Sequence, residues 1–169
     1  QARLRDILHV RVFKAKERVF AQGAPTSALY LVVSGQVKVT RVTPEGHEII
    51  LCVRGPGDYF CPVSVLDGGT QLGTAVALTK VTLLWAERAE FRALCQTSPE
   101  LLLIAQGDCL GEVRRLIDRM ELLAFHSVKE RLAVTMLTAS LHQQTNGVPT
   151  DELRLTQQEL AELVGAARE

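Results

Sequence analysis

The chain has 169 residues, of which 47% are hydrophobic, enough for a buried core and too many for a disordered chain. Its 19 basic and 19 acidic residues give a formal net charge of zero. This balance excludes a protein that wraps nucleic acid over its whole surface, but it leaves room for one local DNA-binding face. No window holds the run of about 18 apolar residues that a transmembrane helix needs, and the N-terminus lacks the layout of a signal peptide. We therefore expect a cytoplasmic protein without a membrane partner.

The first half of the chain consists of short apolar stretches separated by glycine corners. Residues 37–42 alternate apolar and polar side chains, residues 43–46 form a turn, and residues 48–53 return. This pattern predicts a hairpin over 37–53. Residues 74–86 are rich in Val, Thr and Leu and predict two more strands. Many short strands with glycine corners favour a closed roll over a parallel sheet.

A long helix is predicted from Ser98 to about residue 125, because Ser98 and Pro99 suit the N-cap and the first helical position. Apolar residues then recur every seven positions, which is typical of a seam between two helices. The expected dimer interface consists of Leu102, Cys109, Val113, Leu116, Met120 and Leu123. A single helix packed on its own domain is the alternative. The opposite face of this helix, which we expect to be solvated, carries Glu112, Arg114, Arg115, Asp118 and Arg119.

Two capping boxes predict two further helices. Ser127 and Glu130 open one that continues to about residue 143, and Thr156 and Glu159 open another that ends at Gly165. A loop and a short extended piece at residues 152–155 separate them.

The four cysteines are Cys52, Cys61, Cys95 and Cys109, and no two of them have the C-x2-C spacing of a structural zinc site. In a cytoplasmic protein we expect reduced thiols rather than disulfides. No metal site is predicted from their spacing.

Three stretches, taken in order, resemble the CRP/FNR family of bacterial transcription regulators. They are residues 23–39 with a glycine at each corner, residues 57–77 containing Gly57-Asp58-Tyr59-Phe60, and residues 131–133 followed by residues 155–169. The resemblance implies an α+β protein with a double-stranded β-helix, a jelly-roll-like β-roll, as sensor. It also implies three parts: an effector domain at residues 1–97, a dimerisation helix at 98–125 and a partial winged helix-turn-helix at 126–169. The rest of the recognition helix is expected to be either cut off or disordered after residue 169.

The sequence departs from the cyclic-nucleotide binders of that family. Those members place Gly-Glu after the cassette Phe to hold the ribose, and Arg-Ser ten residues on to hold the cyclic phosphate. Here these positions are Cys61-Pro62 and Leu72-Gly73. A buried phosphate without its guanidinium would be an unpaired charge. We therefore predict that the protein does not respond to cAMP.

Two cofactors of other family members, an iron–sulfur cluster and haem, would each need particular ligand residues in this sequence. No cysteine precedes Cys52, so the N-terminal cysteine group of an iron–sulfur sensor is missing from this sequence. The carbon-monoxide-sensing haem activator CooA is similar around Cys61, which makes this thiol a candidate haem ligand, but Val63 stands where its second ligand histidine lies. His9, His47 and His126 are remote alternatives. Haem therefore remains an alternative, and an organic effector is the preferred expectation.

The expected effector site lies between the cassette and the dimer helix, and its lining is mostly apolar. It consists of Cys61, Pro62, Val63, Leu72, Gly73, Thr74, Val113, Leu116, Ile117 and Met120. A largely hydrophobic molecule suits such a lining.

The resemblance also implies which residues contact DNA. Thr156, Gln157 and Gln158 suit phosphate contacts at a helix N-terminus, whereas Arg168 and Glu169 would face base edges. The implied partners are promoter DNA, a second copy of the chain, a small effector and RNA polymerase.

Two other function classes, a cupin-like enzyme and a cyclic-nucleotide-binding module, fit the sequence less well than a regulator does. A cupin-like enzyme needs two or three histidines with a carboxylate, and the roll offers only His47 near a turn. A cyclic-nucleotide-binding module of a kinase or channel would not need the capping box at Thr156 or the ending at Gly165. We therefore expect a regulator and no enzyme.

Overall fold

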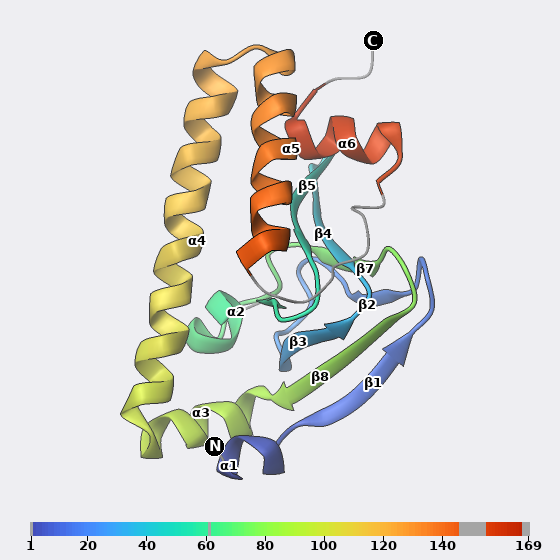
Figure 1. Cartoon of the computed structure of the whole chain (residues 1–169). Helices are drawn as coiled ribbons and strands as arrows, with labels where there is room; N and C mark the ends of the chain where they lie inside the picture. The colour runs from blue at the N-terminus through green and yellow to red at the C-terminus, as the bar shows by residue number, and fades with distance from the viewer. Residues whose placement is uncertain (1, 61, 146–154, 167–169) are drawn as a thin grey trace.

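The computed structural model describes residues 2–60, 62–145 and 155–166 (Figure 1). The strands are β1 (His9–Phe13), β2 (Arg18–Phe20), β3 (Ala28–Ser34), β4 (Val37–Val42), β5 (Glu48–Arg54), β6 (Tyr59–Phe60), β7 (Thr74–Ala77) and β8 (Val81–Glu87). The helices are α1 (Ala2–Asp6), α2 (Pro62–Asp67), α3 (Arg88–Thr97), α4 (Pro99–Phe125), α5 (Val128–Thr145) and α6 (Gln157–Val164).

The strands form two four-stranded antiparallel sheets, ordered β1-β8-β3-β6 and β2-β7-β4-β5. The predicted hairpin over 37–53 is β4–β5, with Val37 opposite Arg54 and a bulge between Val39 and Thr40. Because β5 has a partner on one side only, it is an edge strand of its sheet. The α+β fold with a β-roll, expected from the sequence, is confirmed.

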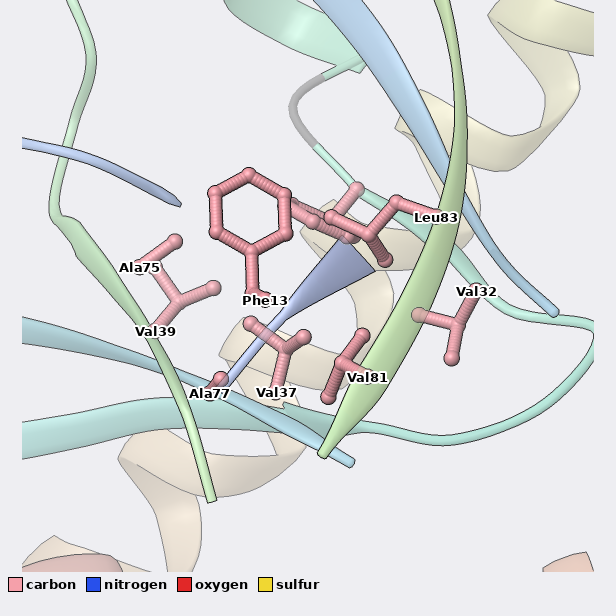
Figure 2. Packing of buried hydrophobic residues seen from close by; sticks show 9 residues of the cluster. Phe13, Val32, Val37, Val39, Ala75, Ala77, Val81 and Leu83 are labelled. Atoms are coloured by element: carbon pink, nitrogen blue, oxygen red, sulfur yellow. The ribbon is translucent and has the colours of Figure 1, made fainter. Parts of the chain in front are cut away.

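The main core lies between the two sheets (Figure 2). It is built from Phe13, Val32, Val37, Val39, Phe60, Ala75, Ala77, Val81 and Leu83. These side chains come from six strands, so the alternation of apolar residues along each strand brings them to one interior. The roll is therefore stabilised mainly by apolar burial between its sheets.

Gly35 makes one corner of the roll possible. Its φ is +80°, a left-handed conformation that favours glycine, and a Cβ at this position would overlap the carbonyl oxygen of Lys80. The turn between β3 and β4 therefore approaches the start of β8 more closely than any side chain allows.

A second apolar cluster joins the roll to the helices. Its buried members are Val65 of α2, Ala86 of β8, Phe91 and Cys95 of α3, and Ala105 of α4. Neither α2 nor α3 was predicted from the sequence: α2 has only six residues, and the N-cap residue of α3, Glu87, makes no capping hydrogen bond through its side chain. Their packing fixes the base of α4 against the roll.

Helix α4 begins where the sequence predicted, with Pro99 in its first turn, although the Ser98 side chain makes no capping hydrogen bond. Leu102 packs against the second apolar cluster of its own domain. The outward face instead carries Leu103, Leu110, Val113, Ile117 and Met120. The helix therefore has two apolar stripes, one directed to its own domain and one exposed.

Helices α5 and α6 begin with the predicted capping boxes. The Ser127 N–H donates to Glu130 at 2.8 Å, and the Thr156 side chain and Glu159 exchange both bonds of the capping box. Gly165 ends α6 in the left-handed conformation, with φ +66°. In Figure 1, α5 runs back toward the roll and α6 lies near β4 and β5. No helix in the described part of the chain is long and apolar enough to span a membrane.

Candidate functional site

A groove of about 500 Å³ lies where the roll meets the helices. One wall is strand β5 with the loop after it, and the other walls are α4, α5 and α6. The apolar part of the lining consists of Leu51, Val53, Pro56, Leu116, Leu122, Leu123, Val134, Leu163 and Val164. The groove thus has the size and the mostly apolar walls of a small-molecule site.

Charged side chains lie at the rim and in the walls of this groove. Arg54 of β5 forms an ion pair with Glu112 of α4, and both side chains are largely buried. Arg115 also pairs with Glu112, at 3.1 Å, from a more exposed position. Of the two pairs, Arg54–Glu112 joins the edge strand of the roll to α4, and Arg115–Glu112 lies within the helix.

Arg119 is a half-buried cation of the groove. One of its terminal nitrogens donates to the Leu51 carbonyl of β5 at 2.9 Å, and the other donates to the Leu163 carbonyl of α6 at 2.8 Å. Burial lowers the pKa of the Arg119 guanidinium, and the nearby Cys52 acts in the opposite direction. The expectation of a solvated face is therefore wrong for Arg119 and for Glu112, because β5 and α6 cover that side of α4.

The structure disperses the described members of the expected effector site. Leu116 lines the groove, whereas Ile117 and Met120 point outward and are 58% and 68% exposed. Leu72 is 52% exposed, and a Cβ on Gly73 would lie 2.5 Å from the Thr40 carbonyl oxygen.

The remaining members of the expected effector site have other contacts or lie outside the described residues. The Thr74 hydroxyl accepts from the Gln22 N–H at 3.0 Å, Val63 is half-buried and Val113 is exposed. Cys61 lies outside the described residues, as does the side chain of Pro62, so the haem-ligand hypothesis stays a prediction.

The groove residues that the sequence did not reveal come mainly from β5, α5 and α6. Leu51 and Cys52 belong to a strand whose alternation was visible, but nothing in the pattern said that helices would cover it. Leu163 and Val164 were recognised only as the apolar side of a short helix. The missing information was the packing of α6 on β5.

The expected dimer interface is divided between the two stripes of α4. Leu102 and Cys109 are half-buried on their own domain, and burial, followed by the charge of Asp108, raises the pKa of the Cys109 thiol. Val113 and Met120 lie on the exposed stripe, while Leu116 and Leu123 border the groove.

The expected DNA contacts are described in part. Thr156 is exposed, but its hydroxyl is engaged in the capping box with Glu159. Gln157 and Gln158 are exposed, and the Gln158 amide donates to Glu162 at 3.1 Å. Arg168 and Glu169 lie outside the described residues.

Histidine and cysteine positions give no metal cluster within residues 2–60, 62–145 and 155–166. His9 packs against Trp85 with ring centroids 5.0 Å apart. His126 follows α4 at its C-terminus, and its Nδ1 lies 3.8 Å from Glu130. The environments of these two histidines are those of a surface ring and a helix-end residue.

Comparisons with known proteins agree with this architecture. Residues 10–98 match the family described as "Cyclic nucleotide-binding domain". The chain is 33% identical over 159 residues to the "CRP-like cAMP-activated global transcriptional regulator" of Mycobacterium tuberculosis, covering 93% of this chain and 71% of that protein.

Two solved structures share the fold. FixK2 from Bradyrhizobium japonicum superposes with a TM-score of 0.82 at 19% identity, covering 95% of this chain and 78% of that one. A variant of CooA from Carboxydothermus hydrogenoformans gives a TM-score of 0.72 at 20% identity, covering 96% of this chain and 72% of that one. The domain match and the mycobacterial relative place the chain in the CRP/FNR family of transcriptional regulators, as a member with a cyclic nucleotide-binding domain.

Proposed function

We propose that the protein is a homodimeric DNA-binding regulator whose roll senses a small effector other than cAMP. The observation that carries the proposal is the groove between β5, α4, α5 and α6. Its walls come from the sensor, from the dimerisation helix and from the helices that open the DNA-binding part. A molecule bound there would contact all three, so its binding energy could favour one arrangement of them over another.

Indifference to cAMP is part of this proposal, although the mycobacterial relative is named as cAMP-activated. The position expected to hold a phosphate cation is Leu72, an exposed apolar side chain. Two arginines of the groove are already engaged, Arg54 with a carboxylate and Arg119 with two carbonyls. A cyclic phosphate bound to either of these two arginines would have to displace such a contact.

The effector we propose is a largely apolar molecule with few polar groups. Leu116 belongs both to the expected effector site and to the groove. We place the effector in the groove against this residue, and the cassette residues 61–63 and 72–74 with Val113, Ile117 and Met120 of α4 stay the alternative position that the sequence predicts. A haem held by Cys61 is the alternative cofactor for the same region.

DNA binding is proposed for the end of the chain. Thr156, Gln157 and Gln158 would contact phosphates at the start of α6, and Arg168 and Glu169 would contact bases. The exposed stripe of α4 would pair with its copy in a parallel dimer. RNA polymerase would then be the partner of the DNA-bound dimer.

Calorimetry of the full-length protein with cAMP tests the choice of effector. We expect no binding, and micromolar binding that substitutions in residues 61–74 abolish would refute the indifference to cAMP.

Native mass spectrometry and a visible spectrum of protein purified from its own host identify a retained molecule. We expect a non-nucleotide ligand that Leu122→Trp, which fills the groove, excludes; a Soret band would support the haem alternative.

A further inference from the structure

The C-terminal end of α6 is stabilised by cations from other helices. The last turn of α6 contains no basic residue of its own. Arg119 of α4 donates to the Leu163 carbonyl at 2.8 Å, and Arg131 of α5 donates to the Gly165 carbonyl at 3.3 Å. Carbonyls at a helix C-terminus carry partial negative charge, so these guanidinium groups satisfy an end that the helix itself leaves open.

Arg119 also reaches the sensor. Its second terminal nitrogen donates to the Leu51 carbonyl at 2.9 Å, and Leu51 lies in β5, the edge strand of its sheet. The planar guanidinium presents donors in a fixed fork, which lets one side chain bond two carbonyls from different elements. Arg119 therefore joins β5, α4 and α6 at one point.

A second link ties the other end of α6 to the roll. Lys38 of β4 lies 2.9 Å from Glu159 in the first turn of α6, and the two side chains are only 15% and 18% exposed. The same carboxylate accepts from the Thr156 N–H and so closes the capping box. With Arg119 near its C-terminus and Lys38 near its N-terminus, α6 is held in both position and direction.

We propose that Arg119 is the positioning residue that docks the DNA-binding helices on the sensor, with Lys38–Glu159 as the second link of the same clamp. We call Arg119, Lys38 and Glu159 together the clamp. The inference rests on the proposed function only in taking α5 and α6 as part of the DNA-binding domain. Opening of the clamp would separate α6 from the β4–β5 hairpin and leave α4 attached to the roll through the second apolar cluster.

The chemistry of the clamp suits a reversible contact. Arg119 donates to two backbone carbonyls, which stabilise the guanidinium less than a carboxylate would. On opening, both the arginine and the two carbonyls regain water, so the net gain from docking is small compared with the gross strength of the bonds. The groove shares β5, α4 and α6 with the clamp, so a ligand that shifts any of them changes the docking equilibrium.

Hydrogen exchange of the full-length protein, without DNA or effector, tests the clamp. In Arg119→Gln, which is too short to reach both carbonyls, we expect exchange of the amides of α6 to rise about tenfold, a factor that corresponds to about 1.4 kcal/mol. Exchange in β3 and β8 should stay at the parent rate. Arg114→Gln is the matched control, because Arg114 is an exposed arginine on the same helix.

Two further variants separate the clamp from general damage. Glu159→Gln keeps a residue type that can close the capping box but removes the ion pair, and Lys38→Met removes the other partner. Both variants should raise the hydrogen exchange of the α6 amides. They test the clamp even if Arg119→Gln does not fold. Arg119→Lys should restore only part of the protection, because an ammonium lacks the planar fork.

The clamp is refuted if α6 exchange is unchanged in Arg119→Gln, or if β3 and β8 exchange faster by the same factor. It is also refuted if Arg119→Gln does not fold and α6 exchange is unchanged in both Lys38→Met and Glu159→Gln. Because the measurement needs neither DNA nor effector, a parent protein that fails to bind DNA would contradict the proposed function and not the clamp.

Discussion

A lysine at Ile117 should dissociate the dimer. Ile117 lies on the exposed apolar stripe of α4 with Leu110, Val113 and Met120, and in the single chain it is 58% exposed. These residues follow one another at intervals of three and four, the spacing of a coiled-coil seam. In a parallel dimer, Ile117 would face its copy across the seam.

The magnitude follows from burial. Complete burial of an isoleucine side chain stabilises by about 1.5–3 kcal/mol, and roughly half of that gain is still available to a half-exposed side chain. Losing it in both copies costs about 2 kcal/mol, and removing two ammonium groups from water adds several kcal/mol. A total of at least about 4 kcal/mol corresponds to a dimer about a thousandfold weaker.

Sedimentation equilibrium across the micromolar range measures this dissociation constant directly. Asp118→Lys is the control, because Asp118 is the exposed neighbour one residue further around the helix. We expect Ile117→Lys to be monomeric where the parent and Asp118→Lys are dimeric. An Ile117→Lys protein that dimerises as tightly as the parent would show that this stripe is not the seam, and a monomeric parent would refute the dimer itself.

Two other predictions concern a corner of the roll and the charge of Glu159. Gly35→Ala should destabilise by at least about 3 kcal/mol, whereas Gly46→Ala should cost about 1 kcal/mol. Both glycines have positive φ, but only Gly35 would direct a Cβ into the Lys80 carbonyl, while Gly46 has open space around it. Equal losses in chemical denaturation would show that the close contact at Gly35 is unimportant. For Glu159, burial raises the pKa, but hydrogen bonds from Thr156 and the ion pair with Lys38 outweigh it, so the pKa lies below its ordinary value of 4.5. Its contribution to stability is therefore present above that pH and is lost as the pH falls through the lowered pKa. The stability difference between parent and Glu159→Gln should shrink on acidification, and a difference that grows would contradict this sign.

The parts of the fold that could be predicted from the sequence are those determined by local signals. The β4–β5 hairpin follows from alternation on both sides of a turn, and the two capping boxes follow from pairs of residues three apart. Such signals act within a few residues, so they need no knowledge of the rest of the chain. The short helices α2 and α3 depend on the cluster in which Val65 of α2 and Phe91 of α3 pack with Ala105 of α4.

The two apolar stripes of α4 could not be told apart from the sequence, for a physical reason. The helix is apolar on two stripes, one through Leu102 that packs on its own domain and one through Leu103 that is exposed. A repeat of seven residues is present in both, so periodicity alone cannot say which stripe meets the second apolar cluster. Only the position of α2 and α3 decides it.

The charged side of α4 shows the same limit more sharply. A row of charged residues on a helix is usually solvated, and Arg114 is indeed exposed. Arg119 is enclosed because its partners are the backbone carbonyls of Leu51 and Leu163, and a backbone carbonyl leaves no mark in the sequence. A contact of this kind is found only after the strand and the helix have been placed in space.

The proposed seam and Arg119 lie on opposite sides of α4, so this helix would link the dimer to the clamp. Successive residues of an α-helix are about 100° apart, so Ile117 and Arg119 point in directions about 200° apart. One would meet the second copy of the chain, and the other bonds the sensor strand and α6. Since a helix turns as a rigid body, a rotation of α4 against its copy would move Arg119 relative to the Leu51 and Leu163 carbonyls. A change at the seam and a change in the docking of α6 are then two consequences of the same movement.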